Sequence, residues 1–156
     1  MKPTVQIPDS EREQIIIKLN DSLAAYQVFY QNLRGFHWNI KGENFFELHV
    51  QFENWYNDAA LQIDALAERI LTLGGEPLHS FKEYLETSAI EPKTKKYNGR
   101  EIMEMIYLDH ISLLHLLGQA VEVAGQSDDE GTNDLLTPMI SNLEKTNWMV
   151  GAWLKS

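Results

Sequence analysis

Cysteine is absent from this chain of 156 residues, and its absence excludes several classes of site. Without thiols the protein can form no disulfide, no thiolate zinc site and no thiol redox centre. The sequence retains five histidines and 23 acidic residues as metal ligands. Imidazole and carboxylate groups suit iron, manganese or zinc better than copper(I).

Long apolar runs are also missing. The first fourteen residues hold no stretch that resembles a signal sequence, and no run elsewhere approaches the ~20 residues of a membrane span. We therefore expect a soluble, cytoplasmic protein with no membrane partner.

Basic residues are few: Lys and Arg number 13 against 23 Asp and Glu, which gives a formal net charge of -10. A field of that sign repels nucleic acid and anionic lipid, and it attracts cations.

The chain shows no internal repeat, no low-complexity segment and no alternating strand pattern. We expect a short arm over residues 1–8 and one all-α domain over residues 9–156. Apolar residues at helical spacing predict four long helices. Their expected ranges are 9 to about 37, 44 to just before 74, 99 to about 124, and 133 or 134 to the C-terminus.

Local signals set these boundaries. Asp9 and Ser10 are candidate caps for the first helix, and the Gly74–Gly75 pair ends the second. An acidic turn is expected over residues 125–133, with Pro138 in the first turn of the last helix. The connection over residues 76–98 is expected to carry a short helix over residues 81–87. Four long helices with one long crossover favour a ferritin-like four-helix bundle.

The second helix carries four polar residues at informative spacings. His49 and Glu53 are four apart, as are Asp64 and Glu68, so each pair shares a helix face. Eleven residues separate Glu53 from Asp64, which places both pairs within roughly 20° of one stripe but about 16 Å apart along the axis. One helix therefore cannot close these residues around a single metal.

A second copy of the helix can close the site. Positions 49 and 68 are centred on 58.5, and so are positions 53 and 64. Two such helices packed antiparallel about a two-fold axis near Asp58 and Ala59 bring 49 opposite 68 and 53 opposite 64, which forms two identical sites. The small Ala59 and Ala60 are expected at the crossing, where Asp58 needs separation from its own copy.

The plain alternative is a solvated helix face, which is the commoner reading of any one pair of charges four residues apart. The agreement of four residues with one symmetric spacing favours a site.

These residues belong to a longer pattern, His-x11-His-x3-Glu-x10-Asp-x3-Glu, which starts at His37. With its flanking segments, it resembles the Dps (miniferritin) family. The similar segments are His37-Trp38, residues 42–49, residues 64–70, residues 74–77, residues 132–134 and residues 147–149.

The resemblance implies a hollow dodecamer that oxidises iron(II), preferably with hydrogen peroxide, stores a ferric mineral and protects against oxidative stress. It implies two irons per intersubunit site, where other divalent metals also fit. His37, His49 and Glu53 come from one chain, and Asp64 and Glu68 come from its two-fold mate. His37, Asp64 and Glu68 hold the tighter iron; His49 and Glu53 serve the weaker position, and Glu68 is a candidate bridge.

Glu53 differs from the family pattern, and Trp38 has two possible roles. Glu53 stands where the family usually has aspartate, so the charge is kept but the carboxylate is displaced by one methylene. Trp38 is implied to lie close to the irons, where it quenches radicals or supplies an electron. The alternative for Trp38, and the favoured reading for Trp148, is packing.

The acidic residues before the last helix also have two readings. As a cap they place favourable charge at a helix N-terminus. By resemblance they surround three-fold pores that draw iron(II) inward, with Asp134 the leading candidate and Asp129 and Glu130 behind it.

Three functions remain in competition: a peroxide-dependent ferroxidase and iron store, a storage cage with a weakened site, and a DNA-protecting assembly. Some members of the family bind DNA through a basic tail, but here Lys2 is the only basic residue before Arg12. Twelve chains of charge -10 carry about -120 in total, so we expect no DNA binding at physiological salt.

The other histidines, His79, His110 and His115, fall outside the pattern and are expected to be structural or exposed. A di-iron site within one subunit needs Glu-x-x-His on two helices. Only Glu76 to His79 fits that motif, and it lies in the crossover, so the sequence does not support such a site.

Overall fold

The structure is a computed structural model that describes residues 5–155. Its described part forms α1 (Asp9–Asn39), α2 (Phe45–Thr72), α3 (Phe81–Thr87), α4 (Gly99–Gln126) and α5 (Glu130–Leu154), with no strand. The predicted ferritin-like four-helix bundle is confirmed, and the short crossover helix has its predicted bounds. The first four residues of the predicted arm lie outside the described residues.

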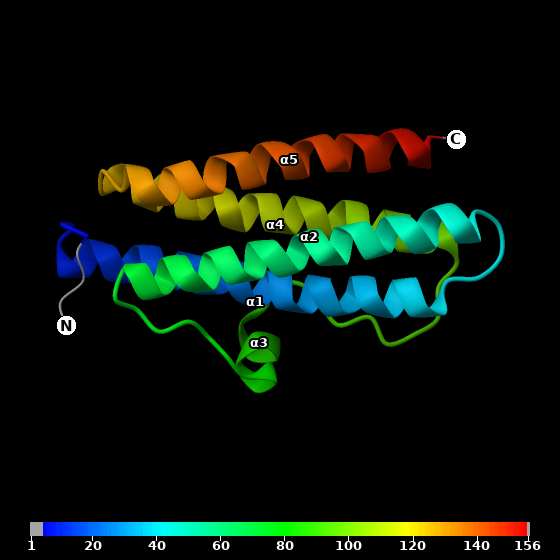
Figure 1. Cartoon of the computed structure of the whole chain (residues 1–156), viewed down its shortest axis with the longest axis horizontal. Coiled ribbons are helices and arrows are strands. Elements are labelled where there is room, and N and C mark those ends of the chain that lie inside the picture. The colour runs from blue at the N-terminus through cyan, green and yellow to red at the C-terminus, as the bar shows by residue number, and fades with distance from the viewer. Residues whose placement is uncertain (1–4, 156) are drawn as a thin grey trace.

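The four long helices form two antiparallel pairs, α1 with α2 and α4 with α5, and α1 also packs against α4 (Figure 1). The core between them is built from fully buried aliphatic and aromatic side chains, among them Leu23, Phe52, Leu66, Ile106 and Leu136. By contrast, α2 and α5 make little contact. The backbones of α2 and α5 therefore lie farther apart than those of α1 and α2 or of α4 and α5.

The start of α1 differs from the prediction. Pro8 occupies the N-cap position, and its carbonyl oxygen accepts the backbone N–H groups of Glu11 and Arg12. Neither Asp9 nor Ser10 caps the helix; Asp9 instead pairs with Arg12 at 2.8 Å. Residues 9–11 are exposed, so the free N–H groups of the first turn can bond to water without a side-chain cap.

α2 ends where the Gly74–Gly75 pair predicts. Gly74 adopts a φ of +79°, the left-handed conformation that the prediction required. A Cβ atom on Gly75 would lie 2.8 Å from the Ile16 side chain, so glycine also permits the close approach of this turn to α1.

The turn between α4 and α5 is shorter than the sequence predicted. α4 continues to Gln126, and α5 begins at Glu130 because the Asp129 side chain accepts the Thr132 N–H as an N-cap. Pro138 consequently lies inside α5 and not in its first turn. α5 nevertheless continues past Pro138, which is exposed and has no N–H to donate to the preceding turn.

The crossover is tied to α1 by two asparagine side chains. Asn20 accepts the Leu78 N–H and donates to the Glu76 carbonyl oxygen, at 2.9 and 3.1 Å. Asn32 bonds the backbone on both sides of Pro92 in the same manner. These bonds hold α3, which begins with a capping box, beside α1.

None of the described helices is long and apolar enough to cross a membrane.

Candidate metal site

Two histidines meet where α1 ends and α2 begins. The Nδ1 atom of His37 lies 2.7 Å from the carbonyl oxygen of His49, and the Nδ1 atom of His49 lies 2.9 Å from that of His37. Their rings stack with centroids 3.7 Å apart. The reciprocal bonds link the two helices across the short turn that follows Asn39.

These bonds also determine the tautomer of each ring. A carbonyl oxygen only accepts hydrogen bonds, so each Nδ1 atom must carry the proton and donate it. The lone pair of each neutral imidazole is then on Nε2, which is the state a metal ligand requires. His37 and His49 therefore each keep the lone pair of Nε2 free of these backbone bonds.

Glu53 lies one turn beyond His49 and is exposed. The Tyr56 hydroxyl donates to its Oε1 atom over 3.4 Å. Loss of solvent around Tyr56, and secondly the Glu53 charge, raise the pKa of this tyrosine. Its ring meets the His37 ring edge to face, with centroids 5.4 Å apart. Tyr56 was missed in the sequence, although its i+3 spacing from Glu53 is a signal.

Asp64 and Glu68 are exposed on the same helix but do not reach the histidines. Along an α-helix, the eleven residues from Glu53 to Asp64 span about 16 Å. Within residues 5–155, no group of three or more histidine, aspartate or glutamate side chains is close enough to share a metal. One chain thus assembles the histidine half of the predicted site and presents the acidic half elsewhere.

The predicted crossing residues need a correction. Ala59 is 1% exposed, whereas Asp58 is exposed and lines a small pocket between the helices. Neither lies in the middle of the stripe that holds the candidate ligands, because at 100° per residue each is roughly 130° away from it. Ala60 is exposed on that stripe and is the small residue available at a crossing.

Large exposed apolar side chains share this face of α2. Phe46, Val50, Leu61 and Leu71 are 81%, 54%, 70% and 59% exposed, and all lie within roughly 70° of the middle of the stripe. We call this surface, together with Glu53, Asp64 and Glu68, the site face. Mixed apolar and acidic exposure of this extent is typical of an interaction surface.

Trp38 and Trp148, for which packing is one of two roles considered, both lie outside the hydrophobic core of the chain. Trp38 is 58% exposed, and the Arg34 guanidinium carbon lies 4.8 Å from the centre of its ring. Trp148 is 70% exposed, so the favoured packing role is not met within one chain.

The candidate pore residues differ in placement. Asp129 is 3% exposed and pairs with Arg69 at 2.6 Å while it caps α5, so its carboxylate is structural and closed to solvent. Glu130 and Asp134 are exposed at the start of α5, as a pore role requires. The Asp-x-x-Thr spacing of a helix cap was the signal that distinguishes Asp129.

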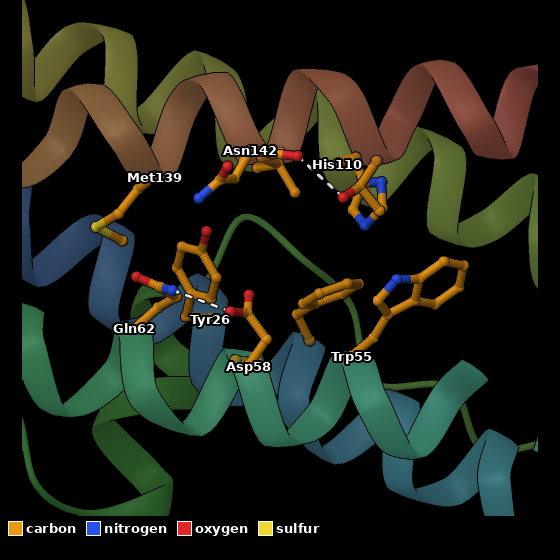
Figure 2. Close-up of a pocket in the computed structure, with 11 residues that line it drawn as sticks. Tyr26, Trp55, Asp58, Gln62, His110, Met139 and Asn142 are labelled. Carbon is orange, nitrogen blue, oxygen red and sulfur yellow. Dashed lines mark hydrogen bonds between the residues drawn. The ribbon is translucent and has the colours of Figure 1, made fainter. Parts of the chain in front are cut away.

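A small pocket of about 40 Å³ lies apart from the site face and is lined by residues of α1, α2, α4 and α5. Figure 2 shows Tyr26, Asp58, Gln62 and Asn142 around one end of it and His110 with Trp55 at the other.

The Nδ1 atom of His110 lies 3.2 Å from Oδ1 of Asn147, and burial lowers the pKa of His110 to about 4. His110 is therefore a buried neutral histidine, whereas His115 and His79 are exposed.

The pH dependence of stability should reveal His110. Its folded pKa lies below the ordinary 6.5, so the protein gains full stability from the neutral ring above pH 6.5 and loses it as the pH falls toward 4. The substitution His110→Gln should remove about 3 kcal/mol of that acid-induced loss, as judged by denaturant unfolding from pH 7.5 to 4. The exposed variant His115→Gln should follow the wild type. Equal acid sensitivity of all three proteins contradicts the assignment.

Comparison with known proteins gives a consistent identification. A family model described as a ferritin-like domain matches residues 16–156. DNA protection during starvation protein 2 of Bacillus anthracis is 42% identical over 142 residues, which cover 91% of this chain and 97% of that protein. A protein named DNA protection during starvation protein from Brevibacillus brevis is 38% identical, over 94% of this chain and 98% of its own length.

Solved structures agree with this result. The Dps protein of Vibrio cholerae O1, described as one of the ferritin-like diiron-carboxylate proteins, has a TM-score of 0.95 and 44% identity, over 98% of this chain and 96% of its own. A Dps protein from Bacillus brevis has a TM-score of 0.91 and 37% identity, over 95% of this chain and 99% of its own. Since the fold, the family model and these relatives agree, the chain belongs to the Dps family of ferritin-like proteins.

Proposed function

We propose that the protein is a ferroxidase and iron store, which oxidises iron(II) with hydrogen peroxide at sites shared between two subunits. The observation that carries the proposal is the His37–His49 pair, whose two Nε2 atoms are made available by reciprocal backbone bonds. This pair adjoins one end of a helix face that carries Asp64 and Glu68 toward its other end.

A second copy supplies what each chain lacks. When the site faces of two α2 helices pack antiparallel, the acidic end of one meets the histidine end of the other, and the apolar side chains between them are buried. Two-fold symmetry makes the two resulting sites identical. Six such dimers would form the hollow dodecamer that stores ferric mineral.

The ligand set suits two iron(II) ions. Three carboxylates and two neutral imidazoles nearly balance two divalent charges, and mixed nitrogen and oxygen ligation is favourable for iron(II). Two irons supply both electrons for one peroxide: two Fe²⁺, one H₂O₂ and two H⁺ give two Fe³⁺ and two H₂O. The paired transfer avoids release of hydroxyl radical, which would protect the cell from oxidative damage.

Protection of DNA would then follow from removal of iron and peroxide. The relatives carry the name DNA protection during starvation protein. With a formal charge of -10 on each chain, this protein repels the phosphate backbone, so we propose that it acts without binding DNA.

Anaerobic loading with iron(II), followed by peroxide, tests the proposal. The wild type should consume about one peroxide per two irons, by the balance above, and its ferric absorbance should rise rapidly. The variant Asp64→Ala with Glu68→Ala should oxidise iron at the rate of buffer alone, because the acidic half of each site is removed.

A matched control removes two exposed carboxylates of α4, Glu104 and Glu122, through Glu104→Ala with Glu122→Ala. This variant changes the net charge equally and should keep wild-type kinetics. The ferroxidase would be rejected if the wild type oxidised iron only at the rate of buffer, and the assigned site would be rejected if the site variant were as fast as an active wild type.

A further inference from the structure

We propose that Tyr56 is a positioning residue, which holds the Glu53 carboxylate in place for the weaker metal position. The inference rests on the proposed function and deepens it, because it assigns a role to a residue outside the five candidate ligands. It also explains how glutamate can serve where a shorter side chain is usual.

Glu53 needs such a partner. Its exposed side chain has three rotatable bonds, and binding a metal requires one orientation out of many, at an entropic cost. Within residues 5–155, the Tyr56 hydroxyl is the group that donates a hydrogen bond to Glu53. The 3.4 Å separation is long for an O–H···O bond, as is common in sites before the ligand binds.

Tyr56 is itself well fixed. Its ring lies edge to face against the rings of His37 and Tyr30, with centroid separations of 5.4 and 6.1 Å. These two contacts restrict the ring and so direct its hydroxyl toward Glu53. Tyr56 therefore connects the Glu53 carboxylate to the histidine pair within one half-site.

The i, i+3 spacing on α2 makes the connection specific. Residues three apart are neighbours on a helix surface, and the longer glutamate side chain can fold back to the hydroxyl. Hydrogen-bond partners of metal ligands commonly raise metal affinity by about 10- to 100-fold. Tyr56 should thus affect the position served by Glu53, and leave the position served by Asp64 and Glu68 unchanged.

Cobalt(II) titration of the assembled protein, followed by visible absorbance and by calorimetry, tests the role without any turnover. The wild type should bind two ions per site with different affinities. Tyr56→Phe should weaken only the second ion, by about tenfold, because the ring stays and only the hydroxyl is lost. Tyr30→Phe, which removes a hydroxyl from the neighbouring ring, is the matched control and should titrate as the wild type.

The same change in a Glu53→Ala background separates positioning from a general structural effect. There the second ion is already weak, so Tyr56→Phe should cause no further loss. The proposal for Tyr56 is overturned if Tyr56→Phe binds both ions as the wild type does, or if it weakens binding equally in both backgrounds. If the wild type and the Asp64→Ala, Glu68→Ala variant bind cobalt alike, the intersubunit site itself is wrong, and the Tyr56 role is rejected with it.

Discussion

An equal mixture of two inactive variants should recover about a quarter of wild-type iron oxidation, because each proposed site takes its ligands from two chains. One variant, Asp64→Ala with Glu68→Ala, keeps the histidine half. The other, His37→Gln with His49→Gln, keeps the acidic half. Half of the dimers formed at random contain one chain of each kind, and one of the two sites in such a dimer is intact.

The measurement is peroxide-dependent ferric absorbance after the two variants are unfolded together and refolded, or produced together. Each variant refolded alone should stay at the rate of buffer. Glutamine is chosen for the histidine variant because its amide can still donate to the backbone carbonyl groups that the rings contact. A mixture that remains inactive, although both variants assemble, contradicts ligation across the interface.

The largest effect on stability is expected at Arg69, which ties the end of α2 to the start of α5. Its Nη2 atom lies 2.6 Å from Oδ1 of Asp129, and its Nε atom donates to the Thr132 hydroxyl over 2.9 Å. Asp129 is 3% exposed. Arg69→Ala would leave that carboxylate buried without its cation, at a cost of about 3–5 kcal/mol. The melting temperature should fall by roughly 10 °C.

Two further variants separate the ion pair from other effects. Lys82→Ala removes one partner of the exposed Lys82–Glu86 pair and should leave the melting temperature nearly unchanged. Arg69→Met with Asp129→Asn removes both buried charges and should recover part of the stability that Arg69→Ala loses. A melting temperature within 2 °C of the wild type for Arg69→Ala, roughly a 1 kcal/mol effect or less, contradicts the assigned role.

The boundaries of the helices show where local sequence was sufficient. The Gly74–Gly75 pair is a signal carried by adjacent residues, so the end of α2 was predicted correctly. The bounds of α3 were also predicted correctly, and its capping box of Ser80 and Glu83 is a local feature of the same kind. The start of α5 was predicted late because Asp129 was read as part of an acidic turn. Its capping role depends on its bond to Thr132, and its burial depends on Arg69, which is 60 residues away in the chain.

The same division applies to the candidate site. Period and spacing alone predicted a helical bundle and a stripe with His49, Glu53, Asp64 and Glu68, since a helix converts sequence separation directly into direction and distance. Helical spacing did not show which residues of α2 face the other helices of the same chain. Ala59 was therefore expected at the crossing, although packing against α1 turns it inward.

The sequence by itself determined the fold class, the five-residue pattern and the two-fold symmetric spacing of four of its residues, because these depend on residue type and helical geometry alone. Only the tertiary structure decided how His37 and His49 meet, which tautomer each ring takes, and that Tyr56 lies between His37 and Glu53. Those features depend on the close approach of α1 to α2. Contacts between helices are set by the packing of whole side chains, which no local pattern specifies.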